Sequence, residues 1–225
     1  MVKLSEKIKV LSLRKEGKSY SQIRSVVKVS KSTLSRWLEN HPLSKERIRT
    51  LQAFSEQRIE HFRETMAAKR ELRLKKTYEE EKRKWLPLSK RELFLAGLFL
   101  YWGEGTKAHR SELTVSNTDP KVITFALYWF IKALKVPKDK IKILVHLYRD
   151  MNIEKELLFW SELTKIPLSQ FRKPYIKKAS LKSINYKGTF GHGTCNIRVS
   201  GTKLTEKILM ALKAVGDHYI DTKGV

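Results

Sequence analysis

One glutamate, Glu104, ends the most apolar segment of the chain, LFLAGLFLYWGEG at residues 93–105. The segment is apolar on every side of a helix, so we expect a helix that is buried all round. Gly105 fits the helix C-terminus, where a carboxylate meets the negative pole of the helix dipole at a cost of about 0.3–1 kcal/mol. A nearby cation is therefore expected. Because Mg²⁺ commonly takes one or two protein carboxylates, Glu104 and Gly105 are the candidate magnesium site.

The stretch LAGLFLYWGEG resembles the LAGLIDADG motif of homing endonucleases, in which an apolar helix with small packing residues ends in an acid and a glycine. The residues after the motif are also similar to that family: a strand at ELTVSN, a helix after NTDP, and further strands. The acid is Glu instead of Asp, and it lies two residues farther from the LAG triplet. The alignment is therefore made on Glu104 and Gly105, and the resemblance covers about residues 88–215.

The resemblance implies a site-specific endonuclease for double-stranded DNA, with a small sheet that forms a saddle on the DNA. In that family two motif helices pack side by side, and each acid lies over a scissile phosphate. Glu104 is thus the implied catalytic residue and Mg²⁺ ligand, and Lys142 and Lys177 are candidates for a basic residue at the same centre. One motif in the chain implies a homodimer through residues 94–103 and a partly palindromic target. The implied interface residues are Ala96, Gly97, Leu98, Tyr101 and Gly103.

A run of 43 residues between Glu162 and Glu206 contains no acid. It holds nine Lys and Arg residues with aromatic residues interleaved, which is what neutralisation of phosphates requires. The alternative is an evenly solvated basic surface. The predicted contacts in this run are Arg172, Lys173, Lys177, Lys178, Lys182, Lys187 and Arg198, and the stretch after the motif adds Lys107, His109 and Arg110.

The overall charge points to the same class of partner. The 225 residues carry 47 Lys+Arg against 23 Asp+Glu, a net charge of +24, which attracts polyanions. One cysteine excludes an internal disulfide and multi-cysteine zinc modules. The longest apolar run, Leu93 to Trp102, is too short to cross a bilayer, and charges interrupt the N-terminal apolar runs, unlike in a signal peptide. We therefore expect a cytoplasmic protein with no membrane partner.

Residues 1–43 predict three short helices. Gly17 ends the first, Ser19 or Ser21 begins the second, and Ser30 caps the third after a tight link. The segment GKSYSQIRSVVKVSKSTLSRWL resembles the helix-turn-helix modules of DNA invertases and transposases, which present their third helix to the major groove. A three-helix bundle that binds protein is the alternative. The residues expected to face DNA are Lys31, Ser32, Thr33, Ser35 and Arg36.

Residues 44–87 form the predicted connection between the two domains. The segment has no Gly and no Pro between Pro42 and Pro87 and is dense in Glu, Lys and Arg, which predicts a long helix. Its few apolar residues hold a rough stripe only in the first half. A solvated spacer helix is the first interpretation, and a coiled coil is the alternative.

Residues 88–225 alternate helix and strand patterns, so the whole chain is assigned to the α+β class: a three-helix N-terminal domain, a helical linker and a mixed α/β domain with a small sheet. Ser89 and Glu92 form a predicted capping box, and Asp119 with Pro120 predicts another helix start. Strands are expected at about 112–117, 141–148, 171–177 and 194–200. Helices are expected at about 90–102, 121–134, 153–165 and 203–215.

A non-catalytic transcriptional regulator with a degenerate LAGLIDADG domain is the alternative function, since some bacterial sporulation regulators pair these modules in the opposite order. The acid at position 104 favours the enzyme, because a carboxylate that faces phosphate gives a pure DNA binder no advantage. A transposase or recombinase requires a D-D-E set or a Ser or Tyr nucleophile, and neither is evident. An RNA target stays open, since attraction to phosphate does not distinguish RNA from DNA.

Overall fold

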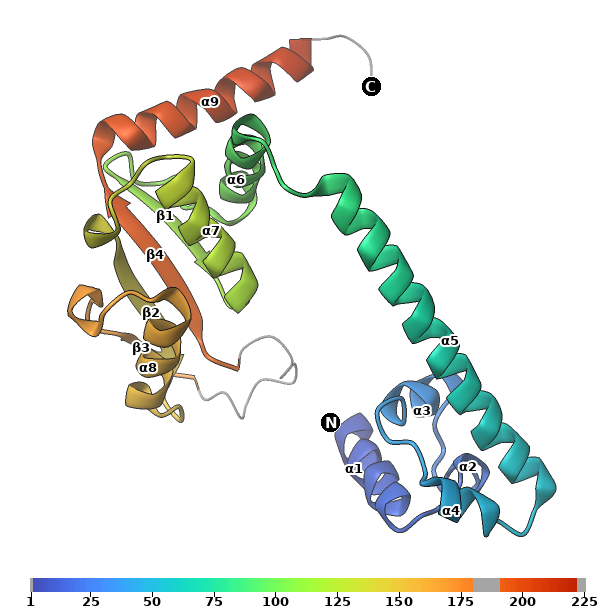
Figure 1. The fold of residues 1–225 in the computed structure, drawn as a ribbon. Helices are drawn as coiled ribbons and strands as arrows, with labels where there is room; N and C mark the ends of the chain where they lie inside the picture. The colour runs from blue at the N-terminus through green and yellow to red at the C-terminus, as the bar shows by residue number, and fades with distance from the viewer. Residues whose placement is uncertain (1, 180–190, 222–225) are drawn as a thin grey trace. The chain divides into compact units, whose positions relative to one another are not determined.

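The computed structural model describes residues 2–179 and 191–221. The chain forms two compact units, Met1–Leu86 and Pro87–Val225, and Figure 1 shows the elements of each. The predicted linker belongs to the first unit together with the predicted helix-turn-helix. In the described part of the chain, no helix is long and apolar enough to cross a membrane.

The first unit begins with three helices: α1 (Val2–Lys15), α2 (Tyr20–Val26) and α3 (Lys31–Trp37). Their starts follow from side-chain capping. The Ser19 hydroxyl accepts a hydrogen bond from the Gln22 N–H in a capping box, and the Ser30 hydroxyl accepts one from the Thr33 N–H. A small core holds the three helices together and consists of Val10, Ile23, Val27, Leu34 and Leu38.

The predicted linker is two helices instead of one. A short helix α4 (Lys45–Arg49) ends at Thr50, and the long helix α5 (Phe54–Trp85) follows. The break has a packing reason, since Leu43, Ile48 and Leu51 form their own buried cluster there. Glu60, early in α5, is also buried. The first turns of α5 therefore pack into this unit, while its second half is exposed as the charged sequence predicts.

The second unit mixes helices and strands as expected for the α+β class. Its main helices are α6 (Lys90–Glu104), α7 (Pro120–Lys132), α8 (Ile153–Thr164) and α9 (Thr202–Asp221), and its strands are β1 (Glu112–Asn117), β2 (Lys142–Tyr148), β3 (Tyr175–Lys177) and β4 (Thr194–Ser200). Two 3₁₀ turns, Lys138–Lys140 and Leu168–Gln170, precede β2 and β3. The predicted caps are confirmed at Ser89, with Glu92 completing the box, and at Asp119 before Pro120.

Two predicted boundaries are wrong. The strand expected from residue 171 begins only at Tyr175, because Phe171 follows the 3₁₀ turn and makes one isolated bridge to Ile143. The last helix runs beyond residue 215 to Asp221. Gly216 does not end the helix, and α9 continues through it to Asp221.

The four strands form one sheet in the order β1-β4-β2-β3. β4 pairs antiparallel with both β1 and β2, and β3 pairs parallel with β2. Alternate side chains point to opposite faces. One face packs under α6, α7, α8 and α9 through a shared hydrophobic core that includes Val115, Ile143, Ile197, Trp129 and Trp160. The strand residues between these core positions define the other face, which we call the polar face.

Candidate functional site

Helix α6 is only partly buried, which corrects the expectation of a helix buried all round. Leu98 and Tyr101 are 1% and 0% exposed in the core of their own unit. Gly97 lies against the Trp129 ring of α7, where an added Cβ would come within 2.1 Å of ring atoms. Three of the five residues predicted for a dimer interface, Gly97, Leu98 and Tyr101, therefore pack inside one protomer.

The opposite side of α6 is open. Phe99 is 50% exposed and Trp102 is 44% exposed, and their rings stack with centroids 5.9 Å apart. Ala96, half-buried, and Gly103, exposed with no atom within 4 Å of an added Cβ, lie at helical spacing on the same side as Phe99. We call Ala96, Phe99, Trp102 and Gly103 the α6 stripe. Ala96 and Gly103, two of the five residues predicted for the interface, belong to this stripe.

Glu104 is the last residue of α6 and is exposed. Lys107 also lies at this end of α6: its ammonium donates a hydrogen bond to the Trp102 carbonyl in the last turn of the helix and lies 5.9 Å from the Tyr101 ring centroid. A cation at the helix C-terminus offsets the negative pole of the dipole. Lys107, one of the predicted nucleic-acid contacts, thus lies at the same end of α6 as Glu104.

Gly105 was expected to end the helix in a left-handed conformation, but the structure requires glycine there for a different reason. Its backbone is extended, with φ −86° and ψ 147°, so it does not use the left-handed region typical of a glycine after a helix. An added Cβ would instead lie 2.2 Å from the Tyr101 ring. Gly105 thus lets the chain turn closely under Tyr101, whose hydroxyl donates to the Thr106 carbonyl at 2.6 Å, and bridge to Val115 of β1.

Within one protomer, the residues at the end of α6 supply few ligands for a metal ion. Among the described residues, no group of three or more His, Cys, Asp and Glu side chains could hold a metal. One carboxylate, from Glu104, and the neighbouring carbonyls are what one chain offers. That set fits Mg²⁺ only where a second carboxylate or phosphate oxygens complete it, as is usual for this ion.

The polar face of the sheet gathers the basic side chains. It carries Lys142 on β2, Lys177 on β3 and Arg198 on β4, and Arg172 reaches it from the segment before β3. The only acid among the residues of the four strands is Glu112. The charge of this face is therefore positive.

Glu112 holds two of these arginines together. Its carboxylate pairs with Arg198 and, at 3.4 Å, with Arg172. Arg198 has only 18% of its side chain exposed, and its buried Nε–H finds no hydrogen-bond partner within the described residues. Lys142 lies directly across from Arg198 in the strand register. These four residues form a cluster with a net charge of +2 and one unused donor, which we call the Glu112 cluster.

Lys142 and Lys177 lie at opposite ends of β2. Lys177 pairs in register with Tyr148 and its ammonium lies 4.7 Å from the Tyr148 ring centroid. Lys142 and Tyr148 are six positions apart along the strand, which is about 20 Å. One protomer therefore cannot bring both lysines to a single phosphate. Between them, burial lowers the pKa of His146, and the charges of Lys177 and Arg198 lower it further, so this imidazole is neutral near pH 7.

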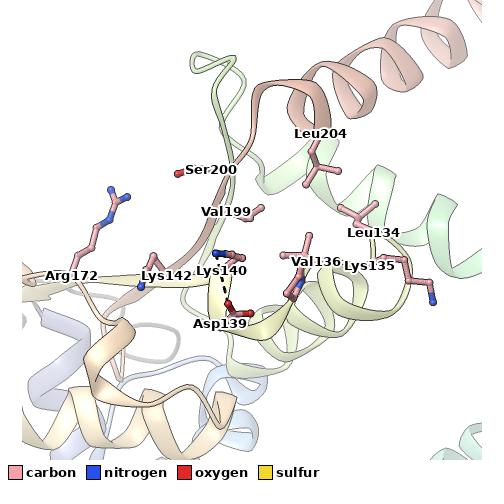
Figure 2. Close-up of a pocket in the computed structure, with 11 residues that line it drawn as sticks. Leu134, Lys135, Val136, Asp139, Lys140, Lys142, Arg172, Val199, Ser200 and Leu204 are labelled. Atoms are coloured by element: carbon pink, nitrogen blue, oxygen red, sulfur yellow. Dashed lines mark ion pairs between the residues drawn. The ribbon is translucent and has the colours of Figure 1, made fainter.

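A hollow of about 620 Å³ opens beside Lys142 and Arg172 at the end of the sheet. Figure 2 shows Lys135, Lys140, Lys142 and Arg172 around it, with Leu134, Val136, Val199 and Leu204 as its apolar wall. Its acid Asp139 lies 3.9 Å from the Lys140 ammonium. The hollow extends the positive surface of the polar face past the start of β2.

The other predicted contacts in this unit are spread along the surface. All four of the following are exposed: His109 and Arg110 between α6 and β1, Lys173 before β3 and Lys178 directly after β3. Lys182 and Lys187 lie outside the described residues.

In the first unit, Lys31, Ser32 and Arg36 are exposed on α3. The Thr33 side chain is engaged in the cap, since its hydroxyl lies 2.8 Å from that of Ser30. The Ser35 hydroxyl accepts a hydrogen bond from Arg63 of α5 at 3.1 Å. Four of the five predicted DNA-facing residues are therefore exposed, and the hydroxyls of Thr33 and Ser35 already hold intramolecular hydrogen-bond partners.

Two residues of this arrangement were missed from sequence. Glu112 begins a strand, and its carboxylate gave no signal because the sequence does not reveal which cations oppose it across the sheet. Arg63 lies within a helix dense in Lys and Arg, so nothing distinguishes it. The alternation of polar and apolar residues in Glu112–Asn117 could have marked Glu112 as lying on the polar face.

The chain matches no model of a known protein family, and it has no match among curated proteins or solved structures.

Proposed function

We propose that the protein is a site-specific endonuclease for double-stranded DNA that acts as a homodimer with Mg²⁺. The observation that carries the nucleic-acid part is the polar face, on which three or more cations surround a single strand acid. Neutralisation of backbone phosphates needs such a surface.

The cleavage part of the proposal rests on Glu104 and on the resemblance of its helix to the LAGLIDADG motif. A homodimer through the α6 stripe would bring two copies of Glu104 near one axis, and two carboxylates with phosphate oxygens are a suitable ligand set for Mg²⁺. When bound, the ion would supply an activated water and stabilise charge on the phosphate. Lys107 would limit the local negative charge at the end of α6.

A non-catalytic DNA-binding regulator is the second candidate. The observation in its favour is the sparse donor set: Glu104 is the carboxylate at the end of α6, and no group of three ligating side chains is found in the described residues. Such a protein would use the same polar face and α3 to bind DNA, and Glu104 would have no role in chemistry.

Cutting of a randomised double-stranded DNA library, with Mg²⁺ and with EDTA, tests both candidates. Breaks at one partly palindromic site that require Mg²⁺ support the endonuclease. Retention of a defined site without breaks contradicts the endonuclease and supports the regulator. Failure to retain DNA at all contradicts both.

A further inference from the structure

Helix α5 is fixed to the first unit by a buried polar network. The Glu60 carboxylate accepts hydrogen bonds from Arg14 Nη1 and Nη2 at 3.0 and 2.7 Å and from the Tyr20 N–H at 2.6 Å. Glu56, one turn earlier, accepts from Gln22 at 3.1 Å. The position of α5 relative to the other helices of this unit is therefore set by its own side chains.

Two arginines of α5 reach the flank of α3. Arg63 donates to the Ser35 hydroxyl at 3.1 Å, and its guanidinium lies 4.7 Å from the Tyr20 ring centroid. Arg70, two helical turns later, pairs with Glu39 just past the end of α3. Both arginines thus lie on one side of α5, and α5 passes beside α3 in Figure 1.

The dimensions of DNA decide what these arginines can touch. A helix with its side chains is about 10–12 Å wide, and the major groove is about 12 Å wide. A helix in the groove fills it, so a neighbouring helix lies outside the groove. Helix α5 reaches α3 and the residues after it through the side chains of Arg63 and Arg70, and these side chains would lie over the wall of the groove, where the sugar-phosphate backbone runs.

We infer that α5 is part of the DNA-contacting surface, with Arg63 and Arg70 binding backbone phosphates beside the groove that α3 enters. This inference rests on the DNA-binding part of the proposed function. The planar guanidinium suits phosphate oxygens, and Arg63 uses one of its nitrogens for the Ser35 hydrogen bond. Arg70 also offsets the negative charge of Glu39, which would otherwise repel the backbone.

The salt dependence of binding tests the inference. The full chain and its variants are titrated into a fluorescent mixed-sequence duplex, and the dissociation constant is measured from about 50 to 200 mM salt. A plot of the logarithm of the association constant against the logarithm of the salt concentration has a negative slope, and each lost phosphate contact makes this slope less steep by about 0.9. We expect such a decrease for Arg63→Gln and for Arg70→Gln, with the same loss of affinity on every sequence.

Arg58→Gln is the matched control. Arg58 is an exposed residue of α5 with the same charge, and it lies five residues before Arg63, about 140° around the helix. The Arg70 side chain is 58% exposed, so Arg70→Gln keeps the test valid if Arg63→Gln disturbs the fold. If Arg63→Gln and Arg70→Gln both give the same slope as Arg58→Gln, the inference about α5 is overturned, while the proposal that the protein binds DNA stands. An unmodified chain that does not bind the duplex overturns the proposed function as well.

Discussion

The carboxylate of Glu60 and the guanidinium of Arg14 form a buried ion pair, with Oε2 and Nη2 2.7 Å apart and side chains 3% and 4% exposed. The pair ties α5 to α1 across 46 residues of chain. Removal of one partner leaves a buried charge without its counter-ion, which typically costs about 3–5 kcal/mol. We expect Glu60→Gln to lower the free energy of unfolding of the first unit by that amount. Urea denaturation measures it, and Glu71→Gln on the exposed side of α5 should change it by less than about 0.5 kcal/mol.

The same residue gives a pH dependence. Burial alone would raise the pKa of Glu60, but the hydrogen bonds from Arg14 and Tyr20 and the charges of Arg14 and Arg63 together lower it. A lowered pKa in the folded state stabilises the fold above the ordinary glutamate value of about 4.3, and that contribution is lost as the pH falls through the lowered pKa. The stability difference between the unmodified chain and Glu60→Gln should therefore be complete at pH 7 and shrink below about pH 4. A difference that stays constant down to pH 2 would contradict the lowered pKa.

The two glycines of α6 should respond oppositely to alanine. At Gly97 an added Cβ meets the Trp129 ring at 2.1 Å, and overpacking of a core costs about 1–3 kcal/mol. At Gly103 an added Cβ meets nothing within 4 Å of its own protomer, and alanine is the better helix former by up to about 1 kcal/mol. Thermal unfolding of the two variants, each made in the Phe99→Lys chain so that no second protomer lies against the α6 stripe, should shift in opposite directions. Equal shifts would show that Trp129 does not pack against α6 as described.

The α6 stripe is the predicted contact between two protomers. We expect the unmodified chain to sediment as a dimer and Phe99→Lys to sediment as a monomer, because a charge would be buried where an aromatic ring packed. Tyr128→Lys on α7 is the control, since Tyr128 is 51% exposed and Phe99 is 50% exposed. A monomer for the unmodified chain, or a dimer that survives Phe99→Lys, counts against the homodimer.

The sequence predicted most of the local structure because short-range chemistry determines it. Ser30, Ser89 and Asp119 were predicted to cap helices, and Ser19 was one of two candidates with Ser21; the structure shows Ser19, Ser30, Ser89 and Asp119 as the caps. The strands expected at about 112–117 and 194–200 are confirmed as β1 and β4 with the same bounds.

The predictions that failed concerned which side of a helix meets which neighbour. Helix α6 is apolar on all sides, so its pattern does not reveal that Leu98 and Tyr101 face their own core while Phe99 remains outside. The charged helix α5 likewise gives no sign that Glu60 is buried by a partner 46 residues away. Long-range packing decides both cases. A helix whose sequence has no clear apolar stripe does not show which of its sides packs against the rest of the protein.

The rate at which the preferred DNA site is cut, measured for the unmodified chain and for Glu104→Gln with Mg²⁺, tests the central claim most directly. Glu206→Gln, an exposed acid on α9, is the matched control. We predict that Glu104→Gln retains the site but cuts it at least about 100-fold more slowly, the scale of loss when one group that stabilises a transition state is removed, while Glu206→Gln cuts at the normal rate. Equal cutting by Glu104→Gln and the unmodified chain would contradict the claim that Glu104 is the catalytic acid.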